Sequence, residues 1–172
     1  MDLVIGGTDN LVTEQIEFVT VEHPMGEQLR QLLLHESKTI DYNMSYKTNV
    51  QASMTEWEVE TRGVKIIDEW ITKDILGVYE KYKMILCNVW FAKYSKEEYT
   101  RSHAHLPAVF SFVYFIQSPS GSSPLVFTHS KKEVEPKEGL LVLFPSVLYH
   151  HVPPNKCDDR IVLAGNISVA TR

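Results

Sequence analysis

The stretch Gly139-Leu-Leu-Val-Leu-Phe-Pro-Ser-Val-Leu-Tyr-His-His-Val-Pro153 decides which fold this sequence adopts. It contains two short apolar runs, 140–144 and 148–152, and residues that favour turns lie before, between and after them. Runs of this length between turn residues are typical of buried β-strands, because a helix needs a longer apolar pattern. We therefore predict two neighbouring strands, the second of which carries His150.

The same pattern extends outward through the second half of the chain. Turn-forming sequences rich in Pro, Gly, Ser and Asp separate the apolar runs. Many short strands without alternating helices indicate a sandwich, a barrel or a jelly roll. Further strands are predicted at 84–94, 108–117, 124–128 and 160–169, with candidate strands at 15–21 and 49–54.

Two helices are predicted in the first half of the chain. One covers 24–36, where leucines recur at helical spacing. The other covers 64–82, with an apolar face made of Ile67, Ile71, Ile75, Val78 and Tyr82. The predicted fold class is mainly β with flanking helices. It forms one domain over 1–172, in which 1–83 supports a jelly-roll core at 84–172.

Composition excludes several classes of function. The chain has 172 residues and a net charge of −5, which argues against a general nucleic-acid binder. Its two cysteines are too few for a disulfide framework or a cysteine zinc ribbon. The first residues lack the features of a signal peptide, and no apolar run is long enough to span a membrane. We expect a cytoplasmic protein with no membrane partner; the oligomeric state is not readable from the sequence.

Five of the seven histidines lie between residues 103 and 151. In a β-strand, residues i and i+2 point to the same face, so His103 and His105 can bind one metal ion together. His150, on a neighbouring strand, completes a facial set of three ligands. His151 would point the opposite way. We interpret the remaining three as solvated or structural: His23, His35 and His129.

Arg160 and a gap in the acidic residues complete the pattern. Arg160 begins an apolar strand, where its side chain would be half-buried and would need an anion. A guanidinium group beside a metal ion favours a carboxylate-bearing cosubstrate that bridges the two. No Asp or Glu occurs between Glu98 and Glu133, where an acidic metal ligand would be expected.

Five segments resemble, in order and spacing, the iron(II)- and 2-oxoglutarate-dependent oxygenases. The resemblance is closest to the small prolyl-hydroxylase-like branch of bacteria and phages, and it covers roughly residues 84–170. Its most specific part is Phe144-Pro145 followed by His150, with Arg160 ten residues further on. The five segments are 103–105, 111–115, 124–127, 139–153 and 160–166.

The resemblance implies a double-stranded β-helix, a cupin-like jelly roll, and an oxygenase, with hydroxylation as the expected activity. It implies that iron(II) is held by His103 and His150, and that Arg160 pairs with the distal carboxylate of 2-oxoglutarate. Tyr94 matches a cosubstrate-contacting tyrosine of prolyl hydroxylases, and Asn166, on the strand face of Arg160, would line the pocket. The implied substrate is a prolyl or similar group, peptidyl or small, in a bacterium or a phage-infected host cell.

His105 departs from the pattern of most of the superfamily, which has Asp or Glu at this position. The small branch often shows His-x-His. A third neutral imidazole leaves a ferrous centre one charge unit more positive than a carboxylate would, and the dianionic cosubstrate compensates for that charge. With His105 as the third ligand, the expected metal set is His103, His105 and His150.

Two other functions stay open. The first is a cupin-type dioxygenase with three-histidine iron and no 2-oxoglutarate, because Gly139, Pro145 and His150 nearly match a cupin motif. Val147 replaces its expected glycine, and Arg160 would then have no role. The second is a non-catalytic jelly roll that binds a small ligand or a partner. The segment 43–57, polar yet rich in Met, Tyr and Trp, is either a lid or a surface loop.

Overall fold

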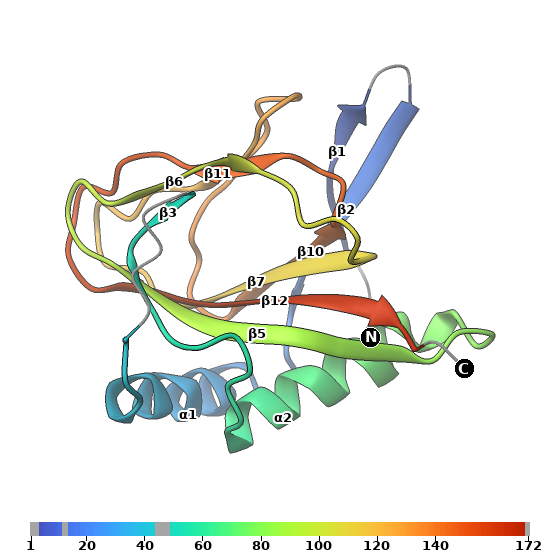
Figure 1. Ribbon diagram of the computed structural model, residues 1–172, viewed down its shortest axis with the longest axis horizontal. Coiled ribbons are helices and arrows are strands. Elements are labelled where there is room, and N and C mark those ends of the chain that lie inside the picture. The colour runs from blue at the N-terminus through green and yellow to red at the C-terminus, as the bar shows by residue number, and fades with distance from the viewer. Residues whose placement is uncertain (1–3, 12–13, 44–48, 171–172) are drawn as a thin grey trace.

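Two antiparallel sheets face each other in the computed structural model, and two helices lie beneath the larger sheet (Figure 1). The structure describes the backbone of residues 4–11, 14–43 and 49–170, and the side chains of 17–43 and 49–170. The larger sheet has the order β1-β2-β10-β7-β12-β5-β4, and the smaller has the order β3-β6-β11-β8-β9.

The bounds of the strands are as follows. The larger sheet contains β1 (Val4–Leu11), β2 (Glu14–Glu22), β4 (Ser53–Met54), β5 (Met84–Tyr94), β7 (Phe110–Gln117), β10 (Leu140–Pro145) and β12 (Arg160–Val169). The smaller sheet contains β3 (Val50–Gln51), β6 (Tyr99–His103), β8 (Leu125–Phe127), β9 (Glu133–Val134) and β11 (His150–Val152).

Alternation of side chains along each strand builds two apolar clusters from one sheet. On β12, Ile161 and Leu163 face the helices, whereas Val162 faces the interior between the two sheets. The same alternation on β5, β7 and β10 separates the residues that contact the helices from those that contact the smaller sheet. Arg160 lies two residues before Val162 on β12, so its side chain points to the same face and into the interior between the sheets.

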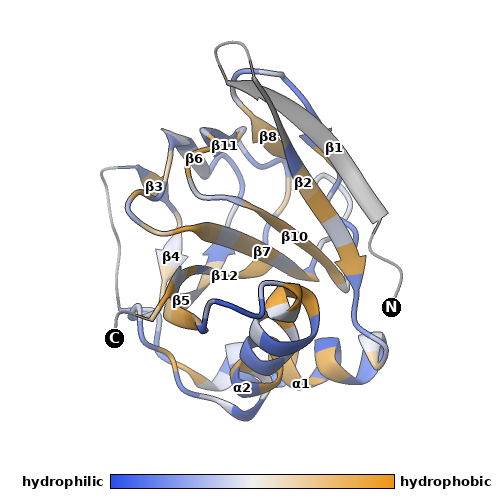
Figure 2. Cartoon of the chain, turned by 90° about the vertical axis from the view of Figure 1, so that its right-hand side faces the viewer, coloured by the Kyte–Doolittle hydropathy of each residue, from blue (hydrophilic) through white to orange (hydrophobic). Residues whose placement is uncertain are grey.

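The helices α1 (Gly26–Thr39) and α2 (Arg62–Glu69) cover the outer face of the larger sheet (Figure 2). The side chain of Thr61 caps α2 by accepting a hydrogen bond from the backbone N of Val64. Glu36 of α1 accepts hydrogen bonds from Thr61 Oγ1 and the backbone N of Gly63. The start of α2 is thereby fixed on α1. No helix among the described residues is long and apolar enough to cross a membrane.

Most of the predicted elements are present. Every strand predicted after residue 83 is found with its ends within two residues of the prediction, and the first helix is found at Gly26–Thr39. The candidate strand at 49–54 consists of two short strands, β3 and β4. Residues 44–48 of the predicted lid or loop lie outside the described residues. Two strands were not predicted, β1 and β9, and β6 was expected as the strand of His103 without predicted bounds.

The helix predicted over 64–82 is wrong beyond Val78. After α2 the chain continues as a π-helical turn, Trp70–Ile75, and a 3-10 turn, Leu76–Val78. Because these turns contain more and fewer residues than an α-turn, the 3.6-residue period is lost. Ile67, Ile71 and Ile75 are buried as predicted, whereas the side chains of Val78 and Tyr82 are exposed.

Replacement of Gly165 by alanine tests the packing of β12. A Cβ at this position would lie 2.7 Å from the carbonyl oxygen of Asn88 and 2.7 Å from the ring of Phe112. We expect Gly165→Ala to lower the free energy of unfolding by about 1–3 kcal/mol, because the neighbouring backbone must shift. Urea denaturation measures the change. Gly26→Ala is the control, because its Cβ would meet no atom within 4 Å, and equal effects of the two substitutions would contradict the packing.

Candidate metal centre

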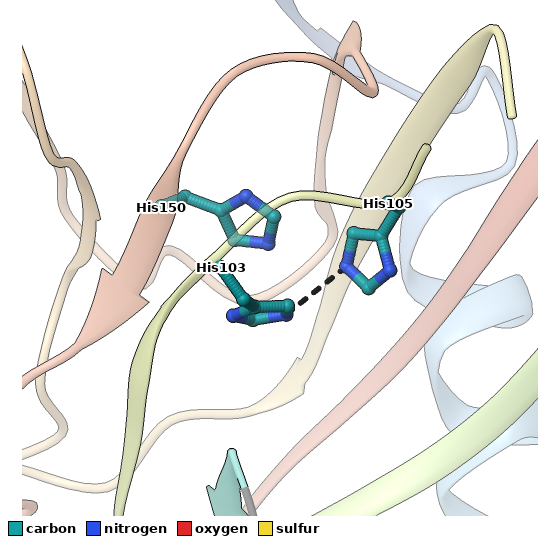
Figure 3. Close-up of side chains that lie close together, drawn as sticks. All are labelled: His103, His105 and His150. Atoms are coloured by element: carbon teal, nitrogen blue, oxygen red, sulfur yellow. Dashed lines mark hydrogen bonds between the residues drawn. The ribbon is translucent and has the colours of Figure 1, made fainter. Parts of the chain in front are cut away.

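Three histidines from the mouth of the double sheet converge on one point (Figure 3). His103 is the last residue of β6 and His150 is the first residue of β11, and the two are directly opposite each other in the antiparallel pair. His105 follows β6 by two residues. Their candidate ligand nitrogens all lie within 4.8 Å of one another.

The placement of His105 on the strand of His103 is a wrong prediction. The strand β6 ends at His103, and His105 is held by a hydrogen bond from its backbone N to the carbonyl oxygen of Ser146, at 2.9 Å. The turn after β6, rather than the pleat of a strand, thus brings the second imidazole to the centre. His151 stands apart from the three, with its Nδ1 3.2 Å from Thr128 Oγ1.

Backbone carbonyls orient two of the three rings. His103 Nδ1 lies 2.8 Å from the carbonyl oxygen of Arg101, and His150 Nδ1 lies 2.9 Å from that of Leu148. A carbonyl oxygen only accepts, so Nδ1 carries the proton in both rings and Nε2 keeps its lone pair. His103 Nε2 and His105 Nε2 are 3.1 Å apart. Two ring nitrogens at this distance share either a proton or a cation.

The three imidazoles are neutral at neutral pH. Burial lowers the pKa of each ring, and repulsion between the rings lowers the pKa of His105 and His150 further. The pKa of His105 falls to about 4, and that of His150 falls well below its ordinary value. Neutral imidazole nitrogens are suited to divalent transition metals.

Arg160 is buried more deeply than predicted, with 1% of the residue's surface exposed. It stands opposite Tyr94 in the β12–β5 pair, and its guanidinium carbon lies 4.7 Å from the centre of the Tyr94 ring. Within the described part of the chain, neither Nε nor Nη1 has a hydrogen-bond partner. A buried, unpaired cation costs several kcal/mol, on the order of the penalty for taking one ion out of water. Two nitrogen atoms of the guanidinium group therefore remain able to donate hydrogen bonds inside the pocket.

Two cavities meet at His103 and His105. The inner one, of about 50 Å³, is lined by Arg160, Tyr94 and all three histidines. The outer one, of about 590 Å³, shares His103 and His105 with it. Among their described lining residues, neither cavity contains Asp or Glu, so the gap in acidic residues noted in the sequence persists at the centre.

The other two predicted pocket residues lie in different cavities. Tyr94 lines the inner cavity beside Arg160, and its hydroxyl is 2.7 Å from Thr100 Oγ1. Asn166 lines the outer cavity instead. Trp90 and Asn88 were not predicted as site residues, although both point to the same face of β5 as Tyr94 and line the outer cavity. Period-two alternation along that strand was the signal that would have found them.

Proteins of known structure resemble this chain in fold, although no sequence match is found. In sequence, the chain matches no protein-family model and no curated protein. In structure, it is similar to the viral collagen prolyl hydroxylase of Paramecium bursaria Chlorella virus-1 in its 2-oxoglutarate complex. The TM-score is 0.71 at 15% identity, over 90% of this chain and 96% of the other. The chain has the fold of the 2-oxoglutarate-dependent oxygenases.

Two further relatives support this double-stranded β-helix. A prolyl-4-hydroxylase of Pseudomonas putida has a TM-score of 0.71 at 17% identity, over 90% of this chain and 93% of the other. HygX of Streptomyces hygroscopicus, with nickel and 2-oxoglutarate bound, has a TM-score of 0.63 at 10% identity, over 88% and 82%. The predicted cupin-like jelly roll is thus confirmed.

Replacement of Arg160 by methionine tests whether the pocket carries an unpaired cation. We expect Arg160→Met to raise the free energy of unfolding of the metal-free protein by about 1–4 kcal/mol, because a buried charge without a partner is removed. Thermal or urea denaturation measures this change. The control is Arg30→Met, which removes an arginine that is paired with Glu27 and Glu138 and should lower stability. A large loss of stability in Arg160→Met would show that its guanidinium is already satisfied.

Proposed function

We propose that this protein is an iron(II)- and 2-oxoglutarate-dependent oxygenase that hydroxylates its substrate. One observation carries the proposal. In a single pocket, the unpaired guanidinium of Arg160 lies together with three neutral imidazoles. Such a pocket offers sites for a carboxylate and for a divalent metal at the same time, and 2-oxoglutarate with iron(II) occupies both.

The roles of the residues follow from their chemistry. His103, His105 and His150 would hold iron(II) through ring nitrogens. Arg160 would donate charge-assisted hydrogen bonds from Nε and Nη1 to the distal carboxylate of 2-oxoglutarate. Tyr94 supports the guanidinium from one side, and the contact of its hydroxyl with Thr100 fixes its ring.

When bound, iron(II) and 2-oxoglutarate supply the oxidative chemistry, in which one oxygen atom of O₂ enters succinate, with loss of CO₂, and the other enters a C–H bond of the substrate. The residues of the chain bind and orient the metal and the cosubstrate, and they exclude water from the pocket. The apolar residues Phe115 and Val162, buried on the interior face, keep the surroundings of Arg160 dry. In a dry pocket, the attraction between the guanidinium and a carboxylate is strengthened.

The substrate is proposed to be peptidyl or small, and a prolyl or similar group is the specific candidate. Support comes from the prolyl hydroxylases among the structural relatives. One of them, from Trichoplax adhaerens, is in complex with a peptide fragment of the hypoxia-inducible factor oxygen degradation domain. Because the sequence identity between the two proteins is only 15%, binding of that peptide is a property of the Trichoplax protein.

Anaerobic addition of iron(II) and 2-oxoglutarate tests the proposal. We expect the visible charge-transfer band that a keto acid chelated to iron(II) produces. His150→Ala should abolish the band by removing a ligand, and Arg160→Met should weaken 2-oxoglutarate binding by about 10-fold or more through loss of a charge-assisted pair. His151→Ala is the matched control, because its ring lies outside the three-histidine set.

The outcomes separate the alternatives. Iron binding without a band in the unmodified protein would contradict the proposal and support the three-histidine dioxygenase that does not use 2-oxoglutarate. Absence of stoichiometric metal binding would contradict both enzymes and support the non-catalytic jelly roll.

A further inference from the structure

The outer cavity beside His103 and His105 is large, open and free of charged side chains among its described lining residues. Its volume of about 590 Å³ suits a small molecule or a short peptide segment. A substrate with a charged group in this space would lose hydration there without gaining an oppositely charged partner. The cavity therefore favours an uncharged ligand.

Two tryptophans and a short loop make the cavity mainly apolar. The rings of Trp57 and Trp90 lie with their centres 6.4 Å apart, and Trp57 keeps 46% of its surface exposed. Leu106, 68% exposed, lines the cavity together with Pro107. Aromatic faces and aliphatic side chains of this kind pack against C–H groups rather than against ions.

A row of hydrogen-bonded polar side chains leads from the core to this apolar wall. The hydroxyl of Ser146 lies 2.7 Å from that of Ser111, which donates to Asn166 Oδ1 at 2.7 Å. Asn166 Nδ2 in turn donates to Asn88 Oδ1 at 2.7 Å. Since Ser111 uses its proton for Asn166, it accepts from Ser146, and every link in the row points the same way. Ser146, Ser111 and Asn166 are buried.

The row ends on a donor at the cavity. Asn88 is half-buried, lines the outer cavity, and accepts through Oδ1, so that its Nδ2 is left to donate. In the described part of the chain, that Nδ2 makes no hydrogen bond to another protein group. Hydrogen bonds aligned in one direction polarise each other, which strengthens the last donor in the row.

We propose that the outer cavity accepts an uncharged, largely apolar substrate group that carries a carbonyl oxygen, and that Asn88 selects it by donating to that oxygen. The inference rests on the proposed function in one respect, namely that the oxidised carbon of this group lies toward His103 and His105. A sugar is a poorer fit, because its many hydroxyls would face the apolar wall. Asn88 is therefore a specificity-determining residue, distinct from the metal set.

Indole signals in the NMR spectrum of the ¹⁵N-labelled full chain test the proposal. The sequence has three tryptophans, of which Trp57 and Trp90 line the cavity, whereas Trp70 is buried elsewhere and serves as an internal reference. Three probes share one skeleton and differ in charge: N-acetylleucinamide is neutral, N-acetylleucine is anionic and leucinamide is cationic. Each is titrated with and without zinc(II) and 2-oxoglutarate, and methyl glucoside is a fourth probe.

The expected result is a shift of the Trp57 and Trp90 signals, with Trp70 unchanged, and a Kd for the neutral probe about 10-fold lower than for either charged one. In Asn88→Asp, which keeps the acceptor for Asn166 but loses the donor, the preference should move to cationic leucinamide. Ser168→Ala, on the same cavity wall but outside the hydrogen-bonded row, should keep the preference for the neutral probe.

Three results would overturn the proposal: equal affinity for all three leucine probes, an unchanged preference in Asn88→Asp, or tighter binding of methyl glucoside. Absence of any shift would overturn it as well. Because the titration is also run without metal and cosubstrate, failure of the chelate band leaves this test intact. A band without neutral-probe selectivity would leave the proposed function standing and refute only this inference.

Discussion

The buried guanidinium of Arg160 is the constraint on which the interior of this molecule depends. Its Nε and Nη1 atoms lack partners in the described structure, and its side chain is closed off from water by aromatic and aliphatic neighbours. A cation in that position is unfavourable until an anion joins it. The three histidines a short distance away are neutral, so they add no competing positive charge until a metal binds.

The strand pairing of the fold explains how Arg160 comes to be buried beside the three histidines. The alternation of β12 sends Ile161 and Leu163 to the helices and leaves Arg160 inside, opposite Tyr94. The smaller sheet brings His103 and His150 face to face through the pairing of β6 with β11. Residues nearly fifty positions apart thereby meet at the mouth of the double sheet. The same alternation on β5 places Asn88 and Trp90 at the outer cavity.

Much of this arrangement could be predicted from the sequence, and the rest depended on tertiary geometry. The strand containing His150 and the strand that begins at Arg160 are visible as apolar runs between turns. The short β6 is polar, so its bounds had no apolar signal, and the turn that positions His105 has no periodic signal. The helix was mispredicted beyond Val78 because π and 3-10 turns break the 3.6-residue period. The division into two cavities, with Asn166 in the outer one, arises only from packing.

The most direct test is the mutual dependence of metal and 2-oxoglutarate binding. The three neutral imidazoles can hold a divalent cation beside Arg160, and a bound dianion is attracted to both positive charges. The two ligands should therefore bind cooperatively. Isothermal titration of 2-oxoglutarate, with and without manganese(II), measures this coupling, which must be equal in both directions. We predict that each ligand tightens the binding of the other by about 10-fold or more, within the usual range of coupling between sites. Independent binding of the two, or no binding of 2-oxoglutarate in the presence of manganese(II), would contradict the account.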